Sequence, residues 1–235
     1  MIFHSINNRI DENPIIKIGK KTIQRAKFVK FLGLLLDENL SLKFHLKELS
    51  KKLARTCGVI SKVKSLLSPD VLLCLYNSFF LSFAQYGIIV WGNTSASYTD
   101  PVYKLQKKLV RIVSSPPARS HSAPIFKSLE LLRISDVFQL KLLTFVFETV
   151  NRMSPSCFDD FFLLNSSVHK YSTREASKGD LFLARKNTLQ YGLNSIRYRG
   201  ARLWNEIPVE LRNSHSKASF KTKVKIYFLC HNYTQ

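Results

Sequence analysis

Asp159 and Asp160 form the only pair of adjacent aspartates, and paired acids can hold the divalent metal ions used in catalysis. The pair follows Pro155 in a segment typical of a loop, and no strand-like run with a further acid lies upstream. A capping or surface role is therefore favoured over metal binding. We expect no catalytic residue and no metal site at this pair.

Other catalytic and metal-binding patterns are also missing from the sequence. The six histidines do not cluster with acids or cysteines at ligand spacing, and there is no Gly-x-Ser-x-Gly motif or phosphate-binding glycine loop. The four cysteines are far apart and form no Cys-x-x-Cys pair, which indicates reduced thiols. The chain is therefore expected to bind no cofactor of its own.

The charge balance indicates a polyanionic partner. Lys and Arg number 36 against 16 Asp and Glu, a formal net charge of +20. Half of this excess lies between Lys17 and Lys64, where 13 basic residues accompany 3 acidic ones. Such a balance favours nucleic acid over an anionic membrane as the partner.

A first basic row is predicted on a long amphipathic helix. Apolar residues recur every three or four positions from Leu42 to Ile60, and Asn39 or Ser41 is the expected N-cap. The basic residues that lie mostly away from this apolar stripe are Lys43, Lys47, Lys51, Arg55 and Lys62. Such a row can follow a phosphate backbone. The alternative is an ordinary solvated face, and the near absence of interleaved carboxylates favours backbone contact.

A second basic row is predicted on a helix that begins at residues 99–101. Its basic face, spaced i, i+3, i+4 and i+7, consists of Lys104, Lys107, Lys108 and Arg111. Further along, Trp204 lies near three arginines, and two interpretations stay open for it. Its ring either stacks on nucleic-acid bases or packs a terminal helix against the core.

The elements that position these residues are predicted to be a few strands followed by many helices. Residues 15–18 and a run from 22 to 36 flank a turn at 19–21, which predicts a β-hairpin. Helices are expected at 42–60, 69–83, 99–113, 124–132, 135–152 and 216–229, with a loop at 155–173. The expected fold class is therefore α+β, mainly α.

Residues 71–99 contain no charged side chain, a length that raises the possibility of a membrane helix. Polar residues recur through the stretch and Gly87 and Gly92 interrupt it, so a buried core helix followed by a strand or loop is favoured. The first residues show no apolar signal-peptide core. We expect an intracellular protein, nuclear or cytoplasmic, that is neither secreted nor membrane-bound.

Several segments, in the same order, resemble the reverse transcriptases of LINE-type (non-LTR, jockey-like) retrotransposons. The similar segments are MIF at the start, FVKFLGLLLDENLSLKFHL (28–46), LYNSFFLSFAQYGIIVWGN (75–93), LQKKLVRIV (105–113), HKYSTR (169–174) and residues 195–208. The resemblance implies three regions. Residues 1–40 would be a remnant of the palm and primer-grip hairpin, 41–120 a helical thumb-like region, and 121–235 a mostly helical post-thumb region.

The resemblance also implies site residues and a partner. Lys30, Phe31 and Gly33 would lie near the primer 3′ end. The residues expected to face the duplex are Lys51, Lys52, Arg55 and Lys62. The partner would be an RNA/DNA template–primer duplex, which is close to A-form and is recognised by shape and backbone.

The metal-binding aspartates of that family, which use Mg²⁺, are expected before residue 1. The sequence therefore predicts a part of a polymerase that holds nucleic acid and is inactive alone. Three alternatives stay open: a stand-alone basic nucleic-acid-binding module, a membrane-associated protein, and a decaying fragment that does not fold stably.

Overall fold

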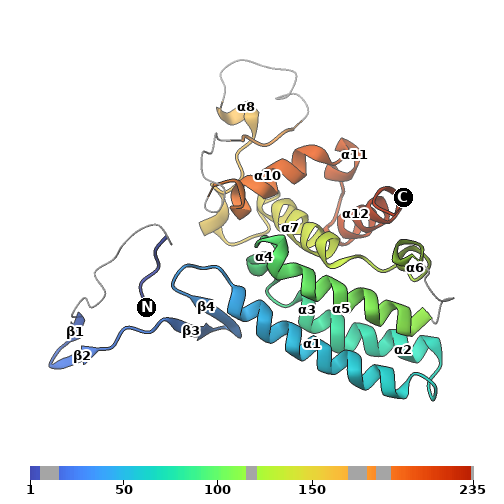
Figure 1. Ribbon diagram of the computed structural model, residues 1–235. Coiled ribbons are helices and arrows are strands. Elements are labelled where there is room, and N and C mark those ends of the chain that lie inside the picture. Colours follow the sequence, from blue (N-terminus) through green and yellow to red (C-terminus); the bar gives the residue numbers. More distant parts are fainter. Residues whose placement is uncertain (6–15, 115–120, 169–178, 184–191, 234–235) are drawn as a thin grey trace.

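The computed structural model of the chain describes residues 1–5, 16–114, 121–168, 179–183 and 192–233 (Figure 1). Two small antiparallel sheets at the N-terminal end precede a mainly helical body. The predicted fold class, α+β and mainly α, is confirmed.

Each N-terminal sheet has two strands. In chain order they are β1 (Ile16–Ile18) with β2 (Lys21–Ile23), and β3 (Phe28–Phe31) with β4 (Leu34–Asp37). The prediction of one hairpin with a long second strand is therefore wrong, because the run from 22 to 36 is interrupted twice. At the second interruption Leu32 and Gly33 adopt φ of 44° and 80°, the left-handed values that a two-residue hairpin turn requires.

A first group of helices lies next to β4 (Figure 1). It comprises α1 (Lys43–Val63), α2 (Pro69–Leu75), the π-helix η1 (Tyr76–Leu81), α3 (Ser82–Gln85), α4 (Ile88–Trp91) and α5 (Ala96–Ser114). The buried residues of α1 are Leu46, Leu49, Leu53, Cys57 and Ile60. The predicted apolar stripe is thus confirmed. Helix α5 begins at Ala96 rather than Thr99, because the backbone amides of Tyr98 and Thr99 already donate to the carbonyl of Ser95.

The uncharged stretch 71–99 is divided among several short helices. The break lies at Tyr86, which is extended, and Gly87, whose φ is 60°. Buried side chains along the stretch, including Phe80 and Trp91, pack into the core of the helical group. Within the part of the chain that the structure describes, no helix combines the length and apolar character needed to cross a membrane.

A second group of helices follows α5 in the chain, and its longest member, α7, buries side chains on nearly all sides. The group comprises α6 (Ser122–Ser128), α7 (Ile134–Val150), the 3-10 helix η2 (Ser156–Phe158), α8 (Asn165–Val168), α10 (Ile196–Glu206), α11 (Val209–Arg212) and α12 (Lys217–His231). Both α10 and α12 pack against α7. Ser216 caps α12 by accepting a hydrogen bond from the amide of Ser219, near the predicted start. The α7 helix begins at Ile134 and ends at Val150, against the predicted range of 135–152.

A buried glutamine joins the two helical groups. Gln106 of α5 donates from Nε2 to the hydroxyl of Tyr76 and to the carbonyl of Leu132, both at 2.9 Å. Its Oε1 accepts from the amide of Ile134 at 3.0 Å. The side chain is fully buried, so this network ties α5 to η1 and to the start of α7.

Candidate nucleic-acid interface

A groove of about 730 Å³ runs between α1 and α5. Its floor is largely apolar, with Leu46, Ala54, Tyr98, Pro101 and Leu105 among the lining residues. Lysines line both sides: Lys43, Lys47 and Lys51 on α1, and Lys104 and Lys108 on α5. Among the described residues that line the groove, none is acidic.

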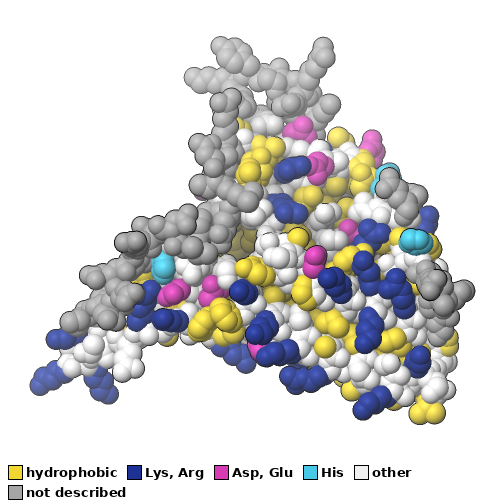
Figure 2. All heavy atoms as spheres, viewed as in Figure 1, with side chains coloured by type: hydrophobic (Ala, Val, Ile, Leu, Met, Phe, Trp, Pro, Cys, Tyr) yellow, Lys and Arg dark blue, Asp and Glu magenta, His cyan; other side chains and the backbone are white. Residues whose placement is uncertain are grey.

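The electrostatic surroundings of the groove are strongly positive. Figure 2 shows dark blue Lys and Arg side chains gathered over α1 and α5, with few acidic side chains between them. The carboxylate of Glu48 accepts a hydrogen bond from Lys51 Nζ at 2.7 Å. This hydrogen bond and the Lys51 charge, followed by the charges of Arg55 and Lys47, lower the pKa of Glu48. The carboxylate of Glu48 is thus stabilised in its ionised form by the basic row around it.

The residues predicted to face the duplex and those of the second basic row divide into three sets in the structure. Lys51, Lys104 and Lys108 line the groove. Arg55, Lys62 and Arg111 are exposed on the outer sides of their helices.

Lys52 and Lys107 lie over aromatic rings instead. Lys52 Nζ is 3.3 Å from the centroid of the Phe83 ring, and Lys107 Nζ is 4.3 Å from that of Tyr103. Each therefore makes a cation–π contact within the fold rather than lining the groove.

Two further residues of the predicted basic row on α1, Lys43 and Lys47, line the groove beside Lys51. Their i, i+4, i+8 spacing places these three lysines on one side of the helix. The apolar residues of the floor that belong to α5 could not be assigned to this groove from the sequence, because a sequence does not state which helix lies opposite α1.

The turn between β3 and β4 lies against the Tyr86–Gly87 bend. The hydroxyl of Tyr86 donates to the carbonyl of Leu32 at 2.6 Å. A Cβ on Gly33 would lie 3.2 Å from the Tyr86 ring, and one on Gly87 would lie 2.8 Å from a methyl group of Leu34. Two of the segments that carry the family resemblance therefore interlock, and both glycines permit the close approach.

Lys30, Phe31 and Leu32 at the same turn point to solvent. Lys30 is exposed, and Phe31 and Leu32 expose 60% and 74% of their surface. Of the three residues predicted near a primer end, Lys30 and Phe31 are thus accessible. Gly33 has a packing contact that explains it without a ligand.

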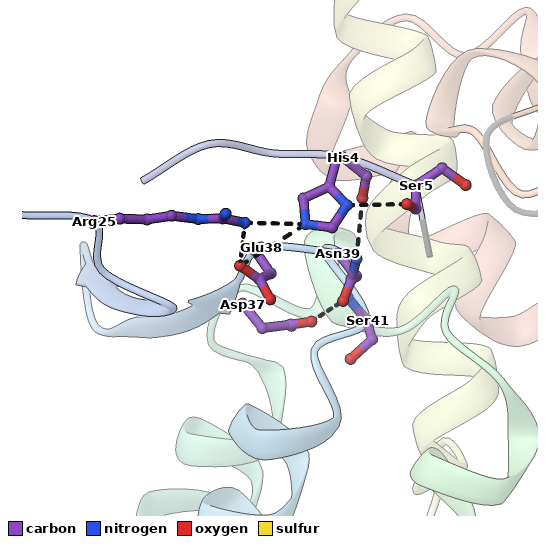
Figure 3. Close-up of polar contacts among 7 residues, drawn as sticks. All are labelled: His4, Ser5, Arg25, Asp37, Glu38, Asn39 and Ser41. Carbon is purple, nitrogen blue, oxygen red and sulfur yellow. Dashed lines mark hydrogen bonds and ion pairs between the residues drawn. The ribbon is translucent and has the colours of Figure 1, made fainter. Parts of the chain in front are cut away.

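A polar cluster holds the connection between β4 and α1 (Figure 3). Asp37 accepts hydrogen bonds from the backbone amides of Leu42 at 2.9 Å and Ser41 at 3.1 Å. The predicted N-cap position, Asn39 or Ser41, is wrong: the structural N-cap is Leu42, with φ of 56°, although the Ser41 hydroxyl accepts from the amide of Lys43 at 3.4 Å. The side chain of Asn39 donates instead to the carbonyl of His4 at 3.1 Å.

The same cluster attaches two more segments to the connection. Arg25, from the loop before β3, forms a 2.8 Å ion pair with Glu38 and lies 3.3 Å from His4 Nε2. The backbone amide of His4 donates to the carbonyl of Glu38 at 3.0 Å. These contacts fix the N-terminal residues and the β3–β4 hairpin relative to the start of α1.

The other residues singled out in the sequence lie at the surface or pack within the protein. Asp159 and Asp160 are exposed at the end of the 3-10 helix η2, and the carbonyl of Asp160 accepts from Arg197 at 2.9 Å. Trp204 is 3% exposed and packs near Phe220, which supports the packing interpretation. The described residues contain no group of three or more His, Cys, Asp or Glu able to hold a metal ion. Residues 169–174, one of the resembling segments, lie outside the described residues.

Comparison with known proteins finds a distant relative. The chain is 25% identical over 136 residues to the RNA-directed DNA polymerase from the mobile element jockey of Drosophila melanogaster. The aligned region is 56% of this chain and 15% of that protein, so the match covers a small part of the relative. No protein-family model matches the chain. No solved structure matches it either. The chain is therefore distantly similar, over part of its length, to a reverse transcriptase of a non-LTR retrotransposon.

Proposed function

We propose that the groove between α1 and α5 binds the sugar–phosphate backbone of an RNA/DNA template–primer duplex, as part of a retrotransposon reverse transcriptase. The observation that carries the proposal is the arrangement of lysines on both sides of an apolar floor. A strand lying along the groove would place its sugars against the floor and its phosphates against the lysines. The similarity to the jockey polymerase supports this choice of partner.

The β3–β4 turn gives the proposal a second contact. The turn is fixed to the α3–α4 bend by the Tyr86 hydroxyl and to the start of α1 by the Figure 3 cluster. Phe31 and Leu32 are therefore presented from a position held relative to the groove. In the proposed complex, this turn and Lys30 contact the primer strand.

We assign no step of nucleotide transfer to the described residues. The Mg²⁺ ions that the related polymerases use need convergent carboxylates, and the described residues form no such group. The proposed contribution of this chain is to hold and orient the duplex.

The test is binding to an RNA–DNA hybrid, measured by fluorescence anisotropy across a salt series. The double variant Lys47→Gln/Lys104→Gln removes one lysine from each side of the groove. Removing two ammonium groups that bind phosphates should reduce the log–log salt slope by about 1.8. The matched control is Lys127→Gln/Lys223→Gln, which removes the same charge from α6 and α12. An equal loss of affinity in the control would show that net charge, rather than the groove, binds the hybrid.

A stand-alone basic nucleic-acid-binding module is the second candidate, and the net charge of +20 favours it. The two candidates differ in what they recognise. A template–primer holder should prefer an RNA–DNA hybrid over B-form DNA of the same sequence at equal salt, because the hybrid is close to A-form. Equal affinity for the two duplexes would favour the general module.

A further inference from the structure

A second cluster of lysines lies where α12 packs on α7, away from the groove. The α12 helix carries four lysines and no acid, and three of them follow one flank at i, i+4 and i+8: Lys217, Lys221 and Lys225. The apolar stripe of the helix, Phe220, Val224 and Phe228, is buried against the core. The lysine flank therefore borders the seam between the two helices.

Contacts at both ends fix how α12 runs along α7. Near one end, Lys217 forms an ion pair with Glu148, and the Phe147 and Phe220 rings stack with centroids 4.5 Å apart. At the other end, the Tyr233 hydroxyl donates to Asp136 at 2.6 Å. The helices are thus antiparallel, and Lys141 of α7 falls between these contacts, opposite the lysine flank of α12.

The pKa of Lys141 reflects its position beside the lysines of α12. Burial, followed by the charges of Lys221 and Lys217, lowers the pKa of Lys141. Both carboxylates at the seam already have partners: Glu148 pairs with Lys217, and Asp136 accepts from the Tyr233 hydroxyl. Across the described parts of the chain, neither Lys141 nor Lys221 forms an ion pair. Lys141 thus lies at a partly dehydrated seam beside the flank of α12 that carries Lys221 and Lys225, an arrangement of positive charge that an anion would stabilise.

We propose that Lys141, Lys221 and Lys225 form a second site for nucleic-acid phosphates, separate from the groove between α1 and α5. A strand bound there would pass along the seam between α7 and α12, with phosphate oxygens accepting from the lysines. An anionic membrane fits less well, because the apolar face of α12 is buried in the core and is not available for insertion. The site does not depend on the groove, and either site can exist without the other.

The test uses the full chain with Lys141→Gln/Lys221→Gln, and Lys223→Gln/Lys127→Gln as the control of equal charge. Lys223 lies on α12 but outside the i, i+4, i+8 flank. The probe is a labelled RNA–DNA hybrid, titrated at about 50 and about 200 mM salt. Because the seam variant lacks two ammonium groups that bind phosphates, its affinity ratio between the two salts should shrink by about tenfold relative to the unmodified chain. The control should keep that ratio.

The substitutions at the seam should not destabilise the protein, so a change in binding can be told from a loss of folding. Replacing Lys141 removes a charge that burial disfavours, so the melting temperature should stay equal or rise. Lys225→Gln, on the same flank of α12 but with Lys141 unchanged, gives a second variant. A hybrid affinity equal to that of the control in both variants would overturn the proposal.

Two further experiments separate the seam from a lipid-binding surface and from the groove. Vesicles of phosphatidylcholine with phosphatidylserine should bind the seam variants and the control alike, and selective loss of vesicle binding would overturn the nucleic-acid assignment. Combining the seam and groove substitutions should add their effects on the salt slope. If only the seam variants change the salt slope of hybrid binding, the groove proposal fails and the seam proposal stands. If only the groove variants change it, the seam proposal fails and the groove proposal stands.

Discussion

Gln106 offers the sharpest test of how the two helical groups are joined. The substitution Gln106→Leu keeps a similar volume but leaves three buried groups without their partner: the Tyr76 hydroxyl, the Leu132 carbonyl and the Ile134 amide. An unsatisfied buried group costs about 1–2 kcal/mol at the lower end of the observed range, so the free energy of unfolding should fall by about 3–6 kcal/mol. This is a large fraction of the total stability of a typical domain, about 5–15 kcal/mol.

The assay is urea unfolding followed by circular dichroism. The midpoint should fall while the slope with denaturant stays unchanged, because the surface exposed on unfolding is the same. Gln24→Leu, at an exposed position, is the control and should change stability by less than about 0.5 kcal/mol. In a double-mutant cycle, Tyr76→Phe should reduce the cost of Gln106→Leu by about 1–2 kcal/mol, since one unsatisfied group is then absent. An unchanged midpoint in Gln106→Leu, or strict additivity in the cycle, would refute the reasoning.

Three further predictions concern other contacts and backbone positions that stabilise the fold. Arg212→Met should cost about 3–5 kcal/mol in urea unfolding, because the buried guanidinium pairs with Asp180 at 2.6 Å and the carboxylate would lose its partner. Burial raises the pKa of Tyr76 to about 12. The contribution of the neutral Tyr76 hydroxyl to the free energy of unfolding is therefore fully present below pH 10.0, and about 2–3 kcal/mol of it is lost as pH rises through 12. In unfolding experiments at alkaline pH, Tyr76→Phe should lose less stability than the unmodified chain by that amount, and the loss that remains in both comes from Tyr233 and Tyr103, whose pKa values burial also raises. Gly87→Ala should lower the melting temperature through about 1–2 kcal/mol of left-handed strain, whereas Gly58→Ala, in a helix with open space at Cβ, should raise it.

Local periodicity is sufficient to predict the long helices. The stripe from Leu42 to Ile60 identifies the buried face of α1, and Ser216 marks the beginning of α12. These features depend on neighbours three or four positions apart, which a sequence states directly. The helix boundary at Ala96 and the N-cap of α1 at Leu42 escape prediction because they depend on backbone conformation that residue types do not specify.

The basic face can be predicted in composition but not in arrangement. The resemblance groups Lys52 with Lys51, and helical spacing groups Lys107 with Lys108. In each pair the structure brings one lysine to the groove and the other over an aromatic ring. The difference is set by which helices lie on either side of α1 and α5. Because those contacts are formed by distant parts of the chain, the groove becomes visible only in the folded structure.

The interlocked turn shows why a retained motif does not by itself identify a binding residue. Gly33 and Tyr86 lie in two resembling segments far apart in the sequence, and the resemblance alone predicts a function near a primer end for Gly33. The structure gives Gly33 a left-handed backbone and close contact with the Tyr86 ring, which restrict this position to glycine whatever the ligand. Phe31 and Leu32 have no such constraint from packing, and Leu32 is held exposed despite an unfavourable left-handed φ. If the turn contacts a primer, the contact therefore belongs to these two exposed side chains and the glycine serves to place them.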